Sequence, residues 1–186
     1  IYVRSKDVAA QEITLNAPLY DAAGTQTFTF RDFKYMLDFK GFSQLSKFAM
    51  SEIELQCENL CSGIRLAPTG IAFNLRDSFI SRPKDRGITS IGGGCQGMLI
   101  DQCQFLSAEE AENVPDRVSI AINANANDVK LRHNRATKFR HFAVLAGQNS
   151  IVLGNHFFQG DSVAQGVRTA GLVIIGTYTS STVSGN

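Results

Sequence analysis

The stretch Val129-Lys-Leu-Arg-His-Asn-Arg-Ala136 carries the pattern that decides the fold. It reads apolar, any, apolar, any, any, small or polar, any, apolar. Alternation this short is typical of brief strands with one buried face and is too brief for an amphipathic helix. The same phrase recurs at 53–60, 73–80, 98–105, 151–158 and, truncated, at 181–186. The chain is therefore expected to be built from repeats.

The repeats are unequally spaced. Their second apolar residues are Leu55, Leu75, Ile100, Leu131, Leu153 and Val183. The step between them varies from 20 residues (55 to 75) to 31 residues (100 to 131). A second set of short apolar runs keeps pace with the first, at 63–66, 87–91, 118–122, 142–145 and 172–175. Constant strands joined by loops of variable length are typical of β-helix coils and argue against a strict-period helical solenoid.

These observations predict an all-β fold, a right-handed single-stranded parallel β-helix with two strands per repeat and irregular loops. Coils stacked about 4.8 Å apart would align the second apolar residues in one inward column. The small or polar residues would form a column of corners. The predicted corner column is Glu58, Ser78, Cys103, Asn134, His156 and Asn186.

We expect one β-helix domain over 1–186, and we interpret the chain as a piece of a longer protein. Regular rungs are predicted at 48–186 and irregular first coils at 1–47. The segment 31–39 has a helix as its alternative, because Phe33, Met36 and Leu37 would share one helical face.

Composition excludes several classes of protein. Lys plus Arg number 18 and Asp plus Glu 17, so the overall charge gives no reason to expect nucleic acid as a partner. No run of 18 apolar residues occurs, and membrane insertion is not expected. Cys57, Cys61, Cys95 and Cys103 form no CxxC pair, so we expect buried, reduced thiols and neither a metal site nor a cofactor.

The phrases at 127–134 and 151–155 resemble the pectate-lyase-like superfamily of right-handed parallel β-helices, over about 48–186. The strings 82–90 and 154–161 are similar, more loosely, to tailspike or tail-fibre proteins of phages and phage-like particles. The resemblance implies polysaccharide recognition, and often cleavage, on the outer face of the solenoid. It also implies a homotrimer and an extracellular or virion-surface location. No catalytic motif of the family matches residue by residue, so the resemblance assigns no active site.

The outward positions beside the inward column supply the candidate binding site. Asp101 is expected one rung from both Arg76 and Arg132. A carboxylate between guanidinium groups can bind an acidic sugar or take part in acid/base chemistry. It can equally be a surface charge ladder, in which each exposed pair contributes about 0.2–1 kcal/mol. The predicted substrate-binding residues are Arg76, Lys130, Arg132 and His133.

Asp101 and Asp77 are the candidate catalytic residues, because glycoside hydrolysis needs two carboxylates that flank the bond. Asp77 lies on the turn side of its rung and could point away from Asp101. The loops at 81–87, 107–117 and 159–170 are long enough to wall a binding face.

Three hypotheses for function stay open. Polysaccharide recognition by the outer face of a larger surface or tail-fibre protein leads. The rivals are a polysaccharide lyase or glycoside hydrolase and a structural stalk. Exposed Leu99 and Val152 would form a trimer contact in the last case. The sequence leaves it open whether the chain is an enzyme.

Overall fold

The fold is described by a computed structural model. It describes residues 3–7, 12–15, 34–39, 48–66, 72–90, 97–107, 118–122, 127–146, 148–158, 170–174 and 181–186. Cys95 and nearly all of the predicted loops at 107–117 and 159–170 lie outside these ranges. Within them every regular element is a strand, which confirms the all-β prediction. In the same ranges no helix is long and apolar enough to cross a membrane.

The contacts divide the chain into two units, Ile1–Asp32 and Phe33–Asn186. In the first unit, β1 (Val3–Asp7) and β2 (Glu12–Leu15) form an antiparallel pair. The second unit begins its regular structure at β3 (Tyr35–Phe39). Because β3 is a strand, the helix considered for 31–39 is wrong. Its side chains alternate between half-buried and exposed, which is the pattern of a strand that covers a core on one face.

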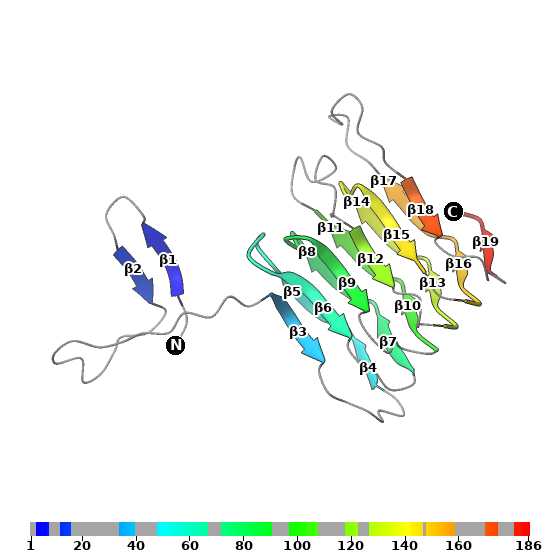
Figure 1. Ribbon diagram of the computed structural model, residues 1–186, viewed down its shortest axis with the longest axis horizontal. Coiled ribbons are helices and arrows are strands. Elements are labelled where there is room, and N and C mark those ends of the chain that lie inside the picture. Colours follow the sequence, from blue (N-terminus) through cyan, green and yellow to red (C-terminus); the bar gives the residue numbers. More distant parts are fainter. Residues whose placement is uncertain are drawn as a thin grey trace. The chain divides into compact units, whose positions relative to one another are not determined.

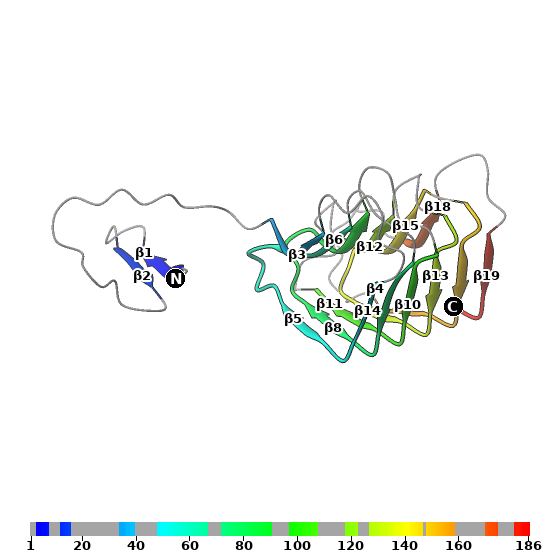
Figure 2. The ribbon, with the colours of Figure 1, turned by 90° about the horizontal axis from the view of Figure 1, so that it is seen from below.

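The second unit is a parallel β-solenoid made of three sheets (Figure 1). The first sheet contains β4 (Phe48–Ser51), β7 (Phe73–Arg76), β10 (Leu99–Asp101), β13 (Lys130–Arg132), β16 (Ile151–Leu153) and β19 (Thr182–Ser184). The second sheet contains β5 (Glu54–Gln56), β8 (Phe79–Ser81), β11 (Gln104–Leu106), β14 (Arg135–Thr137) and β17 (His156–Phe158). The third sheet contains β3, β6 (Ser62–Leu66), β9 (Arg86–Ser90), β12 (Val118–Ile122), β15 (His141–Leu145) and β18 (Ala170–Ile174). Figure 2 shows the three sheets as three sides around the interior, with the second sheet along the lower edge.

A rung has three strands where the sequence predicted two. The predicted second set of apolar runs corresponds to β6, β9, β12, β15 and β18 of the third sheet. The end of the repeated phrase forms a strand of its own, as Arg135–Thr137 does after the corner that follows Arg132. Each such strand is only three residues long, too short to show an alternation by itself.

The inward column of the first sheet differs from the prediction at two positions. The register aligns Met50, Leu75, Ile100, Leu131, Val152 and Val183. Leu55 instead belongs to the second sheet, where it pairs with Ile80. Leu153 faces outward, and Val152 takes the inward place. The sequence could not show which of the three consecutive apolar residues of β16 faces inward. Ile151 and Leu153 are aliphatic, yet they are 37% and 38% exposed.

The corner between the first and second sheets is two residues long in each rung from β4 to β17. Its first residue has a left-handed backbone, with φ between 46° and 62°. These residues are Glu52, Asp77, Gln102, His133, Gly154 and Gly185. The N–H of each of the first five donates to the next rung, as when the His133 N–H donates to the Leu153 carbonyl at 3.0 Å. Hydrogen bonds along the solenoid therefore continue through the corner.

The second corner residue points inward and is bonded to its neighbours. Asn134 Nδ2 donates to Asn155 Oδ1 at 2.9 Å, and Asn155 Nδ2 donates to Asn186 Oδ1 at 2.9 Å. The Cys103 N–H donates to Asn134 Oδ1 at 2.9 Å, which extends the ladder by one rung. The predicted corner column is thus confirmed for Ser78, Cys103, Asn134 and Asn186. Asn155 takes the place predicted for His156, and the site predicted for Glu58 is occupied by Ile53, which pairs through its N–H with Ser78 Oγ.

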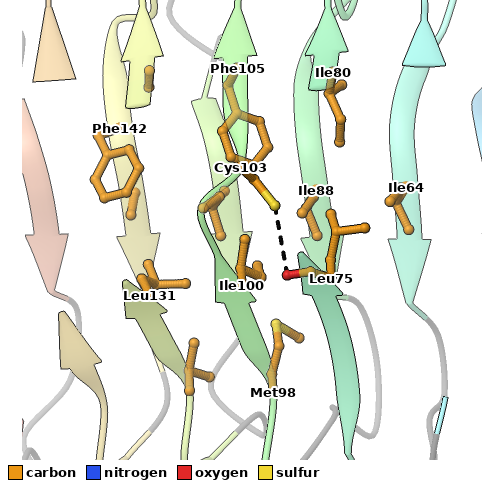
Figure 3. Close-up of a cluster of buried hydrophobic side chains, with 14 of the residues drawn as sticks. Ile64, Leu75, Ile80, Ile88, Met98, Ile100, Cys103, Phe105, Leu131 and Phe142 are labelled. Atoms are coloured by element: carbon orange, nitrogen blue, oxygen red, sulfur yellow. Dashed lines mark hydrogen bonds between the residues drawn. The ribbon is translucent and has the colours of Figure 1, made fainter. Parts of the chain in front are cut away.

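The interior is filled by stacked aliphatic and aromatic side chains (Figure 3). Leu75, Ile100 and Leu131 are completely buried, and Ile80 and Phe105 line the interior from the second sheet. Burial of each aliphatic side chain contributes roughly 1.5–3 kcal/mol, so a few per rung hold neighbouring coils together.

The buried thiols are expected to resist modification in the folded chain. Burial raises the pKa of Cys57 to about 12 and that of Cys103 to about 11, and it also raises the pKa of Cys61. In a Cys95→Ser background at pH 8, we expect a maleimide to label all three more than about a hundredfold more slowly in the folded than in the unfolded chain. Labelling followed by mass spectrometry measures the rates, and fast labelling of Cys57 or Cys103 in buffer would contradict this burial.

The same thiols make the stability of the fold depend on pH. Because they ionise at higher pH in the folded than in the unfolded chain, their contribution is complete below about pH 9 and decreases as the pH rises toward 11 or 12.

Candidate functional site

The outer face of the first sheet brings the predicted charged residues together. Asp101 pairs in register with Arg76 of β7 on one side and with Arg132 of β13 on the other. Lys130 lies on the same face as Arg132, because the two flank the inward Leu131. The strand register thus places all four charged residues on three neighbouring rungs, as the repeat predicted.

Asp101 is the centre of a small hydrogen-bonded cluster. Its side chain is only 8% exposed although it lies on the outer face. Arg132 Nη2 donates to Asp101 Oδ2 at 2.7 Å, and His133 Nδ1 lies 3.3 Å from Asp101 Oδ1. Both carboxylate oxygens are therefore occupied by residues of the next rung. A carboxylate held this way fixes the directions of the guanidinium and the imidazole.

His133 presents its imidazole at the corner. The side chain is 56% exposed, and the residue has φ 53°, a conformation that histidine adopts more readily than most residues. The ring lies against Gly154, where an added Cβ would be 3.0 Å from His133 Cδ2 and 3.4 Å from Nε2. Because Nδ1 faces Asp101, Nε2 is the ring nitrogen that remains for a ligand.

Two cations of this face lack an acidic partner in the part of the chain that the structure describes. Neither Arg76 nor Lys130 has a carboxylate within 4.0 Å there, and both are exposed. Arg132 differs because Asp101 neutralises it. The face therefore presents local positive charge on a chain whose formal net charge is only +1.

Asp77 lies in the corner row rather than beside Asp101. Its side chain is exposed, and its N–H donates to the Asp101 carbonyl at 3.2 Å. The oxygens of the Asp101 carboxylate contact Arg132 and His133. The pairing of Asp77 with Asp101 as two catalytic carboxylates stays a prediction.

The outer face of the second sheet was missed by sequence reasoning. Its strands align Gln104, Arg135 and His156, all of which are exposed. Phe158 follows on β17 and is 47% exposed. The residues that could have indicated this face are the variable positions near the end of the repeated phrase. They were not interpreted as a face because the third strand of the rung was not recognised.

The predicted trimer contact is wrong in one of its two residues. Val152 is buried, with 2% exposure, because it belongs to the inward column. Leu99 is half-buried on the outer face. The exposed apolar side chains next to the charged cluster are Ile151 and Leu153 of β16.

The cluster does not have the composition of a metal centre. Across the described ranges, no group of three or more His, Cys, Asp or Glu side chains is placed to hold a metal ion. What the arrangement offers is exposed cations, one oriented imidazole and adjoining apolar surface.

The chain was compared with known proteins at three levels. No family model matches it, and neither a curated protein nor a solved structure gives a significant match.

Proposed function

We propose that the chain recognises a polysaccharide with the outer face of its first sheet. The observation that carries the proposal is the alignment of Arg76, Asp101 and Arg132 on consecutive rungs, with Lys130 beside them. Exposed cations that have no carboxylate within 4.0 Å among the described residues are available to the acidic groups of a sugar. A guanidinium fixed by a carboxylate, as Arg132 is, loses little freedom on binding. Ile151 and Leu153 provide adjoining surface for the apolar faces of sugar rings.

The setting proposed for this activity is the surface of a larger particle. A solenoid with regular rungs projects its outer face along its length, which suits a tail-fibre-like protein that meets polysaccharide on a cell. We propose that the protein is located outside the cell or on the surface of a phage-like particle, and that it assembles as a homotrimer.

Affinity electrophoresis of the full chain through gels that contain polygalacturonate, hyaluronan or dextran tests the function. We expect retardation by at least one polymer. Arg76→Gln and Lys130→Gln should each weaken it by about threefold to tenfold, because an exposed charge contact is worth about 1 kcal/mol. Arg82→Gln is the matched control, since Arg82 is exposed and pairs with Glu58 at a different corner. Mobility that is unaffected by every polymer would refute the proposal.

A second candidate function, cleavage of the bound polymer, is favoured by the contact between Asp101 and His133. A buried carboxylate that orients an exposed imidazole is an arrangement that serves general acid/base catalysis. Incubation with each polymer, followed by size-exclusion chromatography, tests this. Shortening by the parent and not by His133→Gln would establish cleavage, while polymer of unchanged length would leave the chain a binder.

A further inference from the structure

We propose that the bound polymer crosses the corner between the first and second sheets at Gly154, so that the binding site continues onto β14 and β17. This inference rests on the proposed function and extends its site. The corner strip comprises Arg132, His133 and Arg135 of one rung and Leu153, Gly154, His156 and Phe158 of the next. Three of its members, Arg135, His156 and Phe158, belong to the second sheet.

The corner row changes in shape at Gly154. Glu52, Asp77, Gln102 and His133 carry large side chains at successive rungs, whereas the next two positions are Gly154 and Gly185. The corner thus loses its side chains where the His133 ring lies against Gly154. A chain of sugars that passes from one sheet to the other at Gly154 meets no side chain of that residue and contacts the exposed His133 ring.

The rung before Gly154 carries several basic side chains. Lys130, Arg132 and His133 are followed by Arg135, and the residues between them, Leu131 and Asn134, are buried. Basic side chains therefore continue around the corner from β13 to β14, and Lys130 and Arg135 are the two without a carboxylate within 4.0 Å among the described residues. Arg135 is exposed and has no carboxylate within 4.0 Å among the described residues. An acidic group that has passed the corner would meet this guanidinium.

The rung that contains Gly154 has exposed apolar side chains on both sides of the corner. Leu153 is 38% exposed before the corner, and Phe158 is 47% exposed after it. His156 lies between the corner and Phe158 and pairs in register with Arg135. A sugar ring has a polar edge and an apolar face, and this strip offers cations on one rung and apolar side chains on the next.

The alternative path runs along the solenoid axis from Arg76 toward Lys130. It would use the first sheet alone and would leave Arg135 and Phe158 out of contact. The two paths therefore make different demands on residues of the second sheet. The corner strip carries more cations than acids, and it therefore favours polymers with acidic groups.

Quantitative affinity electrophoresis with polygalacturonate, hyaluronan and dextran distinguishes the paths. We expect an acidic polymer to be preferred to dextran. Arg135→Gln and Phe158→Ala should each lower the association constant for that polymer by at least about fivefold. The controls are Arg82→Gln for the lost charge and Leu60→Ala for the lost apolar side chain, because Leu60 is 78% exposed at another corner. Unfolding midpoints of all four variants should match that of the parent.

Each other result contradicts a different part of the inference. Binding that requires Arg76 but tolerates Arg135→Gln and Phe158→Ala would place the polymer along the axis and leave the proposed function standing. Equal affinity for dextran and the acidic polymers would reject the charge selection alone. Failure of the parent to bind any polymer would reject the proposed function, and the corner path with it.

Discussion

Replacing Asn134 with alanine is expected to lower the free energy of unfolding by about 2–4 kcal/mol. The Asn134 side chain accepts from the Cys103 N–H at 2.9 Å and donates to the Ile100 carbonyl at 2.9 Å. Asn134 is only 1% exposed, so water cannot replace these bonds without entering the core. Each buried polar group left without a partner costs about 1–3 kcal/mol. Equilibrium unfolding in urea measures the loss.

Asn74→Ala is the matched control for this substitution. Asn74 lies half-buried on the outer face of β7, and its replacement should change stability by no more than about 0.5 kcal/mol. If Asn134→Ala proved as mild as Asn74→Ala, the amide ladder would be a packing feature and not a source of stability.

Replacing Gly63 with alanine should destabilise the solenoid by about 3 kcal/mol or more. A Cβ on Gly63 would lie 2.2 Å from the Gly87 carbonyl oxygen and 3.1 Å from Ile80 Cγ2. The first of these atoms is backbone, so relief requires that the third sheet separate between β6 and β9. We expect the urea midpoint to fall sharply, or the cooperative transition to be lost.

Gly171→Ala provides the comparison within the same sheet. At Gly171 the nearest atom to an added Cβ is Phe157 Cδ1 at 3.8 Å, an ordinary contact. The unfolding midpoint of this variant should therefore stay close to that of the parent. Equal losses for Gly63→Ala and Gly171→Ala would contradict the role of the close approach at Gly63, because only that site lacks room for a Cβ.

The β-solenoid could be predicted because its rungs repeat the same short phrase. Leu75, Ile100 and Leu131 occupy equivalent places, and polar residues flank Leu75 and Leu131 on both sides, so the phrase reveals both the strand and its buried face. Alignment of Arg76, Asp101 and Arg132 followed from that phrase without further information. The pairing of Asp101 with His133 did not follow, since it depends on the left-handed corner that turns the imidazole back toward the previous rung.

The predicted register was wrong where an apolar residue occupies a position that is polar in most other rungs. Ile53 is apolar at a corner place that other rungs fill with serine, cysteine or asparagine, so the first repeat was read five residues too late. At β16, Ile151 and Leu153 are apolar on the outer face, and hydrophobicity could not distinguish them from the inward Val152. Such outward apolar residues are ordinary on protein surfaces, which is why alternation alone cannot settle a three-residue strand.

The constant two-residue corner makes a whole rung an exchangeable unit of length. The other connections differ greatly between rungs, from the short link between β14 and β15 to the long one between β11 and β12. Duplication or deletion of a rung with its ends in those links would move everything beyond it by about 4.8 Å along the axis. The solenoid can in this way gain or lose length in steps of one rung, and the outer faces on either side of the change stay the same.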